Sequence, residues 1–293
     1  MRTGAIGASW TRGAIPWLFV GPATVMFAIW VLYPIFDSFR ISFYHWSGIG
    51  HPRFIGWHNY AELFASDTFR QSIINNILWL LLMMLAPPLG LAAALLLNQQ
   101  MLGMRIAKTL FFFPFVLSQV VIGVVFSWFY QPAGGLLDTL LRGFGGSGLA
   151  VLSNPNLVTF GIIAAGLWPQ TAYCMILYLT GLNGLNPEQI EAGRLDGARG
   201  LRLLWHVVLP QLRASNFIAF VVTIIGALRS FDLIAVMTQG GPFGSSSVLG
   251  WMMYQEAISN YRYGYGAAVG VVLFVIMSVF IGVFLWRILK TLN

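Results

Sequence analysis

Six long apolar stretches constrain this chain more than any other feature of its sequence. Each is long enough to cross a bilayer core of about 30 Å, which needs about 20 apolar residues. Only 9% of the 293 residues are charged, against about 25% in an average soluble domain. The sequence therefore predicts an all-α integral membrane protein with six transmembrane helices. The stretches cover approximately residues 15–36, 73–97, 108–130, 157–182, 212–236 and 266–289.

The basic residues indicate the orientation of these spans. A net charge of +7 would suggest nucleic acid in a soluble chain, but here the basic residues flank spans and follow the positive-inside rule, so we expect no nucleic-acid partner. Both termini are then cytoplasmic, and the outer segments hold only Arg40, Arg53, Arg70, Arg142 and Arg262. The inner segments hold Arg2, Arg12, Arg105, Lys108, Arg194, Arg199, Arg202, Arg213, Arg287 and Lys290.

The same spans divide the chain into parts. The first apolar run is too long for a signal peptide, so we expect it to be retained as the first helix. Residues 1–72 would hold the N-terminal tail, this helix and an outer loop. Residues 73–289 would form a core of five helices, with residues 183–213 as a long cytoplasmic connection and 290–293 as a cytoplasmic tail.

Several chemistries lack the residues they need. The single Cys174 excludes a disulfide framework and a cysteine metal cluster, and no His, acid or Ser constellation suggests a metal site or a membrane-embedded enzyme. An ion-coupled transporter would normally need more intramembrane ionisable groups than Arg229 and Asp232, and inverted repeats. No phosphate-binding GxxxxGK[ST] motif is present, since neither Lys108 nor Lys290 follows a glycine. We therefore expect a transport subunit rather than an enzyme, with its energy supplied by another chain.

The connection at 183–213 is predicted to be a helix, a bend and a second short helix. Asn186 is a suitable N-cap, and Pro187 suits the first helical position. Glu188 and Glu191 then fall where the helix dipole favours acids. After a bend at Gly197, we expect one face of the second helix to carry Leu201, Leu204 and Trp205, with Leu209 and Pro210 ending it.

A fixed spacing within this connection is more specific. Glu191-Ala192-Gly193 is followed by Gly197 and then by Val207-Val208-Leu209-Pro210. This spacing resembles the EAA loop of binding-protein-dependent ABC importer permeases, where EAA, three residues, Gly, nine residues and Ile-x-Leu-Pro follow one another. Gly193 stands where Ala is usual, and Val207 where Ile is usual.

The resemblance extends to carbohydrate-type permeases, in particular to the first permease of maltose-type systems without its large extra outer domain. In this respect the chain looks more like the permease subunits of lactose, multiple-sugar and glycerol-3-phosphate importers than like the enterobacterial maltose permease. The residues that carry it are Tyr33-Pro34, Phe54-Ile55-Gly56, Asn59-Tyr60, Asn76, Arg229-Ser230-Phe231-Asp232 and Thr238-Gln239-Gly240-Gly241-Pro242.

This resemblance implies a type I ABC importer permease in a bacterial or archaeal cytoplasmic membrane. Its partners would be a second permease, normally in a heterodimer, two ATPase subunits that bind ATP and Mg, an extracytoplasmic binding protein and membrane lipid. The chain itself would bind no cofactor.

Glu191 would pair with a basic residue of the ATPase, and Asp196 would cap the second helix. Arg194, Arg199 and Arg202 could instead contact lipid headgroups. The implied ATPase-coupling residues are Glu191, Ala192, Gly193, Asp196, Gly197, Leu209 and Pro210.

A sugar path needs aromatic faces and a few hydrogen-bonding groups in an apolar wall. The fourth and fifth spans offer both, and alignment on Glu191 places most of the candidates at or beside the pocket positions of maltose-type permeases. For Trp168 and Tyr173, plain helix packing remains an alternative. The predicted path residues are Trp168, Gln170, Tyr173, Thr223, Gly226, Ala227 and Ser230.

Arg229 and Asp232 are three residues apart, so one helical face could hold them as an intramembrane ion pair. The predicted cargo is a mono- or oligosaccharide. The alternative within the same importer class is glycerol-3-phosphate or another polyol derivative, although a phosphate would prefer fixed positive charge in the path and only Arg229 offers it.

Overall fold

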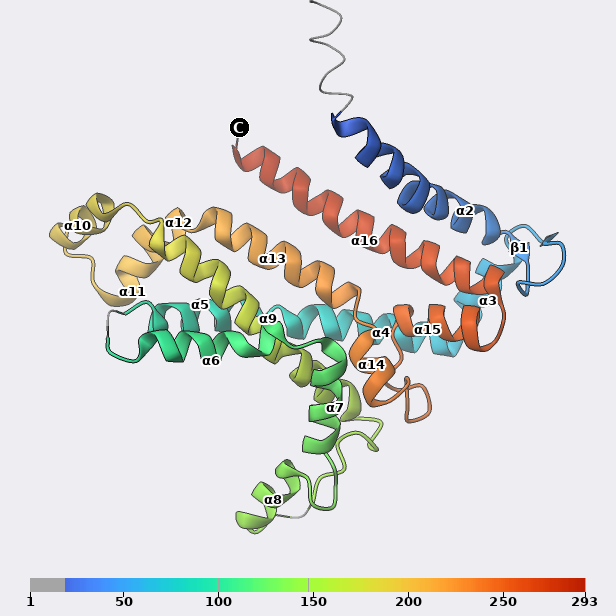
Figure 1. Ribbon diagram of the computed structural model, residues 1–293, viewed down its shortest axis with the longest axis horizontal. Coiled ribbons are helices and arrows are strands. Elements are labelled where there is room, and N and C mark those ends of the chain that lie inside the picture. Colours follow the sequence, from blue (N-terminus) through green and yellow to red (C-terminus); the bar gives the residue numbers. More distant parts are fainter. Residues whose placement is uncertain (1–18, 100, 147, 293) are drawn as a thin grey trace, which may run out of the picture. The chain divides into compact units, whose positions relative to one another are not determined.

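The computed structural model describes residues 19–99, 101–146 and 148–292 (Figure 1). Arg2 and Arg12, used above to orient the first span, lie outside the described residues. The chain divides into two compact units, and each is described by itself. One comprises Met1–Phe64 with Met253–Val272, and the other comprises Ala65–Met252 with Leu273–Asn293.

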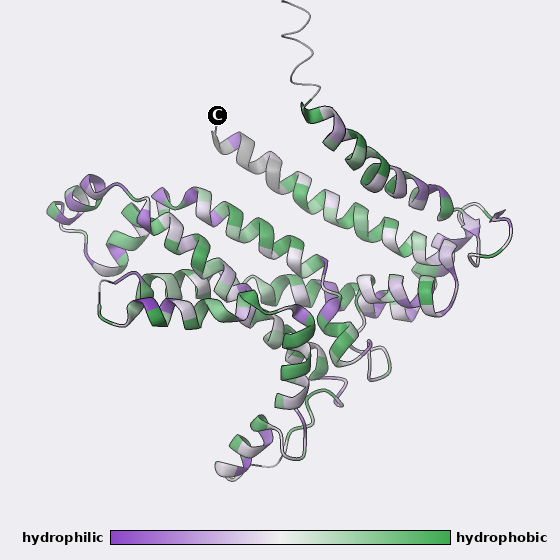
Figure 2. Ribbon diagram, in the orientation of Figure 1, coloured by the Kyte–Doolittle hydropathy of each residue, from purple (hydrophilic) through white to green (hydrophobic). Residues whose placement is uncertain are grey.

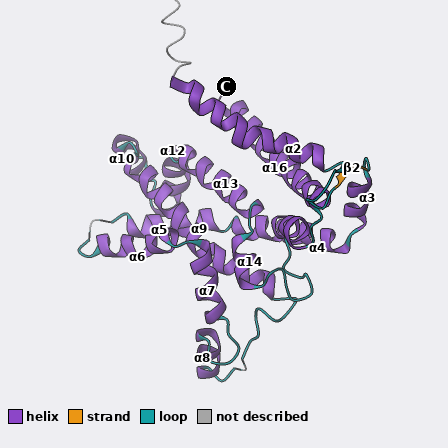
Figure 3. Ribbon diagram, turned by 45° about the vertical axis from the view of Figure 1, so that its right-hand side comes forward, coloured by secondary structure: helices purple, strands orange, loops and turns teal. Residues whose placement is uncertain are grey.

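The first unit begins with a continuous helical stretch, Phe19–Ile41, which contains a π-turn, η1 (Ala28–Leu32), and α2 (Tyr33–Ile41). A short antiparallel pair follows, β1 (Tyr44–His45) with β2 (Arg53–Phe54), and then α3 (His58–Ala65). Figure 3 shows this strand pair in a chain that is otherwise helical. The unit also holds η3 (Gln255–Ser259) and the start of α16 (Tyr263–Leu292).

Side-chain hydrogen bonds order the connection after the first span. The Asn59 side chain donates to the carbonyl oxygens of Ser42 and Tyr44, at 2.8 and 3.0 Å. The Arg262 guanidinium donates to both carboxylate oxygens of Glu62. Residues 37–72, expected to be an outer loop, are therefore largely folded into helix ends, the strand pair and α3.

The second unit is a helical bundle joined by short turns and one long connection. Figure 2 shows apolar residues along most of its helices and polar residues concentrated around α10. Its elements are α4 (Asp67–Met83), α5 (Ala86–Leu97), α6 (Met104–Val116), α7 (Gln119–Phe129), α8 (Leu136–Gly143), α9 (Val158–Asn183), α10 (Pro187–Leu195), α11 (Gly200–Leu203), η2 (Leu204–Val208), α12 (Leu209–Gln211), α13 (Arg213–Leu228), α14 (Asp232–Met237) and most of α15 (Leu249–Tyr254).

Four described helices are long and apolar enough to cross a membrane by themselves: Phe19–Ile41, Asp67–Leu97, Val158–Asn183 and Tyr263–Val283. Two further candidates are bent pairs, so the number rises to six only if each pair is one span. Met104–Val116 and Gln119–Phe129 meet at 99°, and Gly200–Gln211 and Arg213–Leu228 meet at 79°.

Two predicted spans are therefore not the straight helices that we expected. The stretch 108–130 breaks because Leu117 is extended and the Ser118 side chain accepts a hydrogen bond from the Val121 N–H, which starts a new helix. The stretch 212–236 begins at the 79° bend before Arg213 and is interrupted a second time, since α13 ends at Leu228 and α14 begins at Asp232. Apolar length alone did not reveal either interruption.

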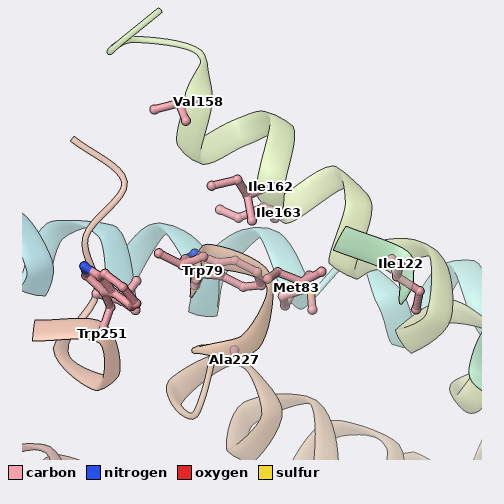
Figure 4. Packing of buried hydrophobic residues seen from close by; sticks show 11 residues of the cluster. Trp79, Met83, Ile122, Val158, Ile162, Ile163, Ala227 and Trp251 are labelled. Atoms are coloured by element: carbon pink, nitrogen blue, oxygen red, sulfur yellow. The ribbon is translucent and has the colours of Figure 1, made fainter. Parts of the chain in front are cut away.

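A buried apolar cluster lies where α4, α7, α9, α13 and α14 meet. In Figure 4, Trp79 and Met83 of α4 face Ile162 and Ile163 of α9, with Ala227 of α13 close by. Burying such side chains is the main stabilising term of a core, about 25 cal/mol per Å² in water. Within a bilayer, close packing must supply more of the stability because lipid is itself apolar.

A polar latch holds the segment after α14 against α4. Asn75 donates to the carbonyl oxygens of Ser245 and Ser247, each at 2.7 Å, and Ser72 donates to the Ser247 hydroxyl at 3.0 Å. The Asn76 side-chain oxygen accepts from the Leu249 N–H at 2.9 Å. These bonds fix α14 from its C-terminal side, which matters for the site below.

We expect Gly90→Ala to destabilise the bundle. A Cβ at Gly90 would lie 2.5 Å from the Cys174 Cβ and 2.8 Å from the Met175 backbone nitrogen, so α5 and α9 would have to separate. Such overpacking typically costs about 1–3 kcal/mol, more than the gain of up to about 1 kcal/mol in helix propensity. Thermal unfolding of the detergent-solubilised protein should show a lower Tm. Gly143→Ala is the control, because no neighbour lies within 4 Å of its added Cβ, and equal Tm values for the two variants would contradict this packing.

Candidate functional site

A pocket of about 330 Å³ lies in the second unit where the helix breaks between α13 and α14. It is bounded by side chains from α4, the start of α7, the middle of α9, the end of α13 and the start of α14. The lining residues are Trp79, Met83, Gln119, Gly166, Gln170, Val222, Ile225, Gly226, Arg229, Ser230, Phe231, Asp232 and Leu233.

A hydrogen bond between α9 and α13 orients one polar wall of this pocket. Gln170 Nε2 donates to Thr223 Oγ1 at 2.8 Å, and Thr223 Oγ1 donates in turn to the Ala219 carbonyl oxygen at 2.7 Å. Thr223 is fully buried. It therefore holds Gln170 in place from behind instead of facing the pocket.

Two glycines, Gly166 and Gly226, line the pocket near Gln170. A Cβ built on Gly226 would meet only Gln170 Oε1, at 3.9 Å. At Gly166, an added Cβ would come within 3.1 Å of Leu233 and 3.2 Å of Trp79. Gly226 therefore leaves space beside Gln170, whereas Gly166 lets Leu233 of α14 and Trp79 of α4 pack closely on α9.

The expected ion pair between Arg229 and Asp232 is not formed, and its premise of a single helical face is wrong. Arg229 follows the end of α13, Asp232 starts α14, and Ser230 and Phe231 between them are non-helical. Among the described residues, neither side chain has an ion-pair partner, yet both line the pocket.

The predicted path residues fall into three groups. Gln170, Gly226 and Ser230 line the pocket, whereas Thr223 and Ala227 are buried behind it. Trp168 lines a separate apolar pocket of about 480 Å³ between α5, α6 and α9. Tyr173 stacks on Phe115 of α6, with ring centroids 4.9 Å apart, as plain helix packing would have it.

Several lining residues were not predicted, notably Trp79, Gln119, Gly166 and Phe231. Gly166 could have been found, because it precedes Gln170 by one helical turn and so shares its face. Gln119 could not, because its position depends on the unexpected break before α7.

A second site is the connection from α9 to α13, residues 184–212, which we call the inter-span segment. Asn186 caps α10 as predicted, since its side-chain oxygen accepts from the Glu188 N–H at 2.9 Å. The Asn186 N–H donates to Gln211 Oε1 at 3.0 Å, which ties the start of the segment to its end.

The predicted bend at Gly197 is confirmed, with φ +84°. The Ala198 N–H donates to the Gly193 carbonyl and the Gly197 N–H to the Arg194 carbonyl, at 2.9 and 3.1 Å. This is a Schellman motif, in which glycine takes the left-handed position that ends a helix. Asp196 therefore terminates α10, and the expectation that it caps the second helix is wrong, since α11 begins after Arg199 without a side-chain cap.

Gly193 and Val207, the two residues that depart from the EAA pattern, pack against each other. A Cβ at Gly193 would lie 2.8 Å from Val207 Cγ2 and 3.3 Å from Leu203 Cδ1. The absence of a Cβ at this position allows α10 to pack closely on the π-turn η2. Gly193 and Val207 thus form one packing contact between the two halves of the segment.

The outer face of the segment is exposed and partly apolar. Leu195, Leu201 and Trp205 are 89%, 72% and 65% exposed, and Glu191 is exposed without an ion-pair partner in the part of the chain that the structure describes. Leu204 instead packs on the buried cluster around Leu212, so the expected shared face of Leu201, Leu204 and Trp205 is wrong. Exposed apolar groups beside a free carboxylate are typical of a protein contact surface.

Comparisons with known proteins match this architecture. Residues 86–292 match the family described as "Binding-protein-dependent transport system inner membrane component". The probable ABC transporter permease protein YurN of Bacillus subtilis is 33% identical, over 89% of this chain and 91% of its own length. The alpha-glucoside transport system permease protein AglF of Rhizobium meliloti is also 33% identical, over 93% of this chain and 81% of its own.

A solved structure shares the fold. A chain of a bacterial alginate ABC transporter, in complex with an alginate pentasaccharide-bound periplasmic protein, superimposes with a TM-score of 0.81 over 93% of each chain, at 20% identity. The predicted helical fold of an ABC importer permease is therefore confirmed. From the family match and the two relatives, the chain belongs to the family of binding-protein-dependent transport system inner membrane components.

Proposed function

We propose that this chain is a permease subunit of an ATP-driven importer that carries a mono- or oligosaccharide across the cytoplasmic membrane. The observation that supports this most is its likeness, over nine-tenths of its length, to a permease named for alpha-glucoside transport. The pocket at the α13 break supports it further, because amide, hydroxyl and aromatic groups line it together with Arg229 and Asp232.

In this proposal α6 with α7 forms one bent span and α13 with α14 forms another, which gives six spans with both termini in the cytoplasm. Residues 1–72 carry the first span and outer connection, residues 73–289 form the core, and residues 290–293 form the tail. The partners are a second permease, two ATPase subunits that hold ATP and Mg, and an extracytoplasmic binding protein like the one in the alginate complex.

The inter-span segment is then the cytoplasmic coupling loop. Its exposed apolar groups Leu195, Leu201 and Trp205 would enter a groove of the ATPase, and Glu191 would pair with a basic residue there. Ala192 and Pro210 are exposed on the same segment, and Leu209 is half-buried. Paired charges and buried apolar anchors are the usual basis of such an interface.

The loop is built to move as one body with the helices on either side. The Schellman motif, the Gly193–Val207 contact and the Asn186–Gln211 hydrogen bond join its two halves. Movement of the loop would pass directly to α9 and α13, which carry Gln170 and Thr223. ATPase closure would thereby change the spacing of the two pocket walls.

Glu191→Ala should uncouple the importer. With one charge of the docking pair removed, we expect ATP hydrolysis stimulated by sugar-loaded binding protein to fall at least about tenfold, since loss of a buried charged partner costs about 2–5 kcal/mol. The assay uses the full complex in proteoliposomes. Glu188→Ala, an exposed acid on the same helix, is the matched control and should retain stimulation. If the Glu191 variant assembles and is stimulated normally, the docking role is wrong; if no ATPase subunit co-purifies, the importer assignment itself fails.

Gly193→Ala should impair coupling between the ATPase and the pocket, because it disturbs the packing of α10 on η2 inside the loop. The new Cβ would press on Val207 Cγ2, so α10 and η2 must shift apart. We expect reduced stimulation of ATP hydrolysis and partial recovery in the double variant Gly193→Ala/Val207→Ala. Gly184→Ala serves as the control, because its added Cβ would meet only backbone oxygens at 3.6 and 3.9 Å. A double variant that is no better than Gly193→Ala alone would contradict this contact.

A further inference from the structure

Two charged residues, Arg229 and Asp232, line the pocket on either side of the break between α13 and α14. Arg229 follows the last turn of the 16-residue α13, whose carboxyl end carries partial negative charge. Asp232 is the first residue of the six-residue α14, and the start of this helix has no side-chain cap hydrogen bond. Neither forms an ion pair within the described residues, so their side-chain donors and acceptors stay available in the pocket.

We propose that Arg229 and Asp232 are specificity-determining residues that together select an uncharged, polyhydroxylated ligand. This inference rests on the proposed function and names the substrate class of the same pocket. A sugar hydroxyl both donates and accepts hydrogen bonds, so neighbouring hydroxyls satisfy a carboxylate and a guanidinium at once.

The balance of charge argues against the other ligand classes. A carboxylate or phosphate drawn to Arg229 would also meet the like charge of Asp232, and an ammonium drawn to Asp232 would meet Arg229. Selectivity of this kind comes as much from repulsion of the wrong ligand as from attraction of the right one. Glycerol-3-phosphate and uronic acid chains are therefore disfavoured here.

The other lining residues also suit an uncharged, polyhydroxylated ligand. Gln119, Gln170 and Ser230 are polar without charge, and Gln170 is held by Thr223 through its nitrogen, which leaves its oxygen beside the open space at Gly226. Phe231 is fixed by stacking on Trp251, with ring centroids 6.0 Å apart, and adds an apolar face to the lining. Amide and hydroxyl groups around an apolar face suit the two-sided surface of a sugar ring.

The test is equilibrium dialysis of the complete importer in lipid nanodiscs, without binding protein, against matched radiolabelled pairs. These are methyl α-glucoside with methyl α-glucuronide, cellobiose with cellobiouronic acid, and glycerol with glycerol-3-phosphate, with glycine betaine as a zwitterion. Wild type should bind the neutral member more tightly in each pair that it binds. Asp232→Asn should raise the anionic-to-neutral affinity ratio at least about tenfold, and Arg229→Gln should lower it.

Arg213→Gln and Asp67→Asn are the controls, because both remove an exposed charge at the far end of a helix that lines the pocket. They should leave the ratio unchanged. Preference for the anion or the zwitterion in wild type, a ratio unmoved in both pocket variants, or no binding of any pair would overturn the inference. The coupling assay separates this from failure of the proposed function: stimulation by sugar-loaded binding protein with an unmoved ratio overturns only the specificity role.

Discussion

Backbone polar groups inside a bilayer have no water to bond to, so a helix can be interrupted only where protein or a wet cavity satisfies the freed groups. The break between α13 and α14 meets this condition locally. The Arg229 N–H still bonds to the Ile225 carbonyl, and the Ser230 hydroxyl bonds to the Ala227 carbonyl at 2.9 Å. The Asn75 latch then holds the segment that follows α14. The pocket exists because this interruption is stabilised from both sides, and a continuous helix would place Arg229 and Asp232 on one surface as a pair.

The same two helices link the pocket to the inter-span segment. α9 ends at Asn183, three residues before the cap of α10, and α13 begins directly after the segment. The Gln170–Thr223 bond crosses between them about halfway along. A displacement at the segment can therefore reach the pocket through rigid elements, since helices transmit shifts along their axes and packed interfaces have discrete arrangements rather than deforming continuously. This route needs no flexible connection between the two sites.

Much of the architecture could be predicted because it depends on local patterns. Apolar length located the four described helices that are long enough to cross a membrane by themselves, Asn186 and Pro187 fixed the start of α10, and Gly197 fixed the bend. The interruption at Ser118 was missed because a single serine in a largely apolar run has no clear signal until its hydrogen bond is known. The interruption at Ser230 was missed because the spacing of the charges of Arg229 and Asp232 also fits one helical face. Asp196 was misplaced for a related reason: an acid before a glycine suits a helix start as well as the end of a Schellman motif, and only the bonds of Gly197 and Ala198 distinguish them.

The pocket was harder to predict than the fold because lining residues come from five elements far apart in sequence. Thr223 and Ser230 were both chosen for their polarity on one helix, yet Thr223 is buried behind Gln170 while Ser230 faces the cavity. Polarity on a membrane helix indicates that a side chain has a partner, and the partner can be another helix as readily as a ligand. Gln170 shows how both roles combine, since its nitrogen bonds to Thr223 and its oxygen remains beside Gly226. A buried polar group such as Thr223 thus determines which hydrogen-bonding atoms of its neighbours remain available to the substrate.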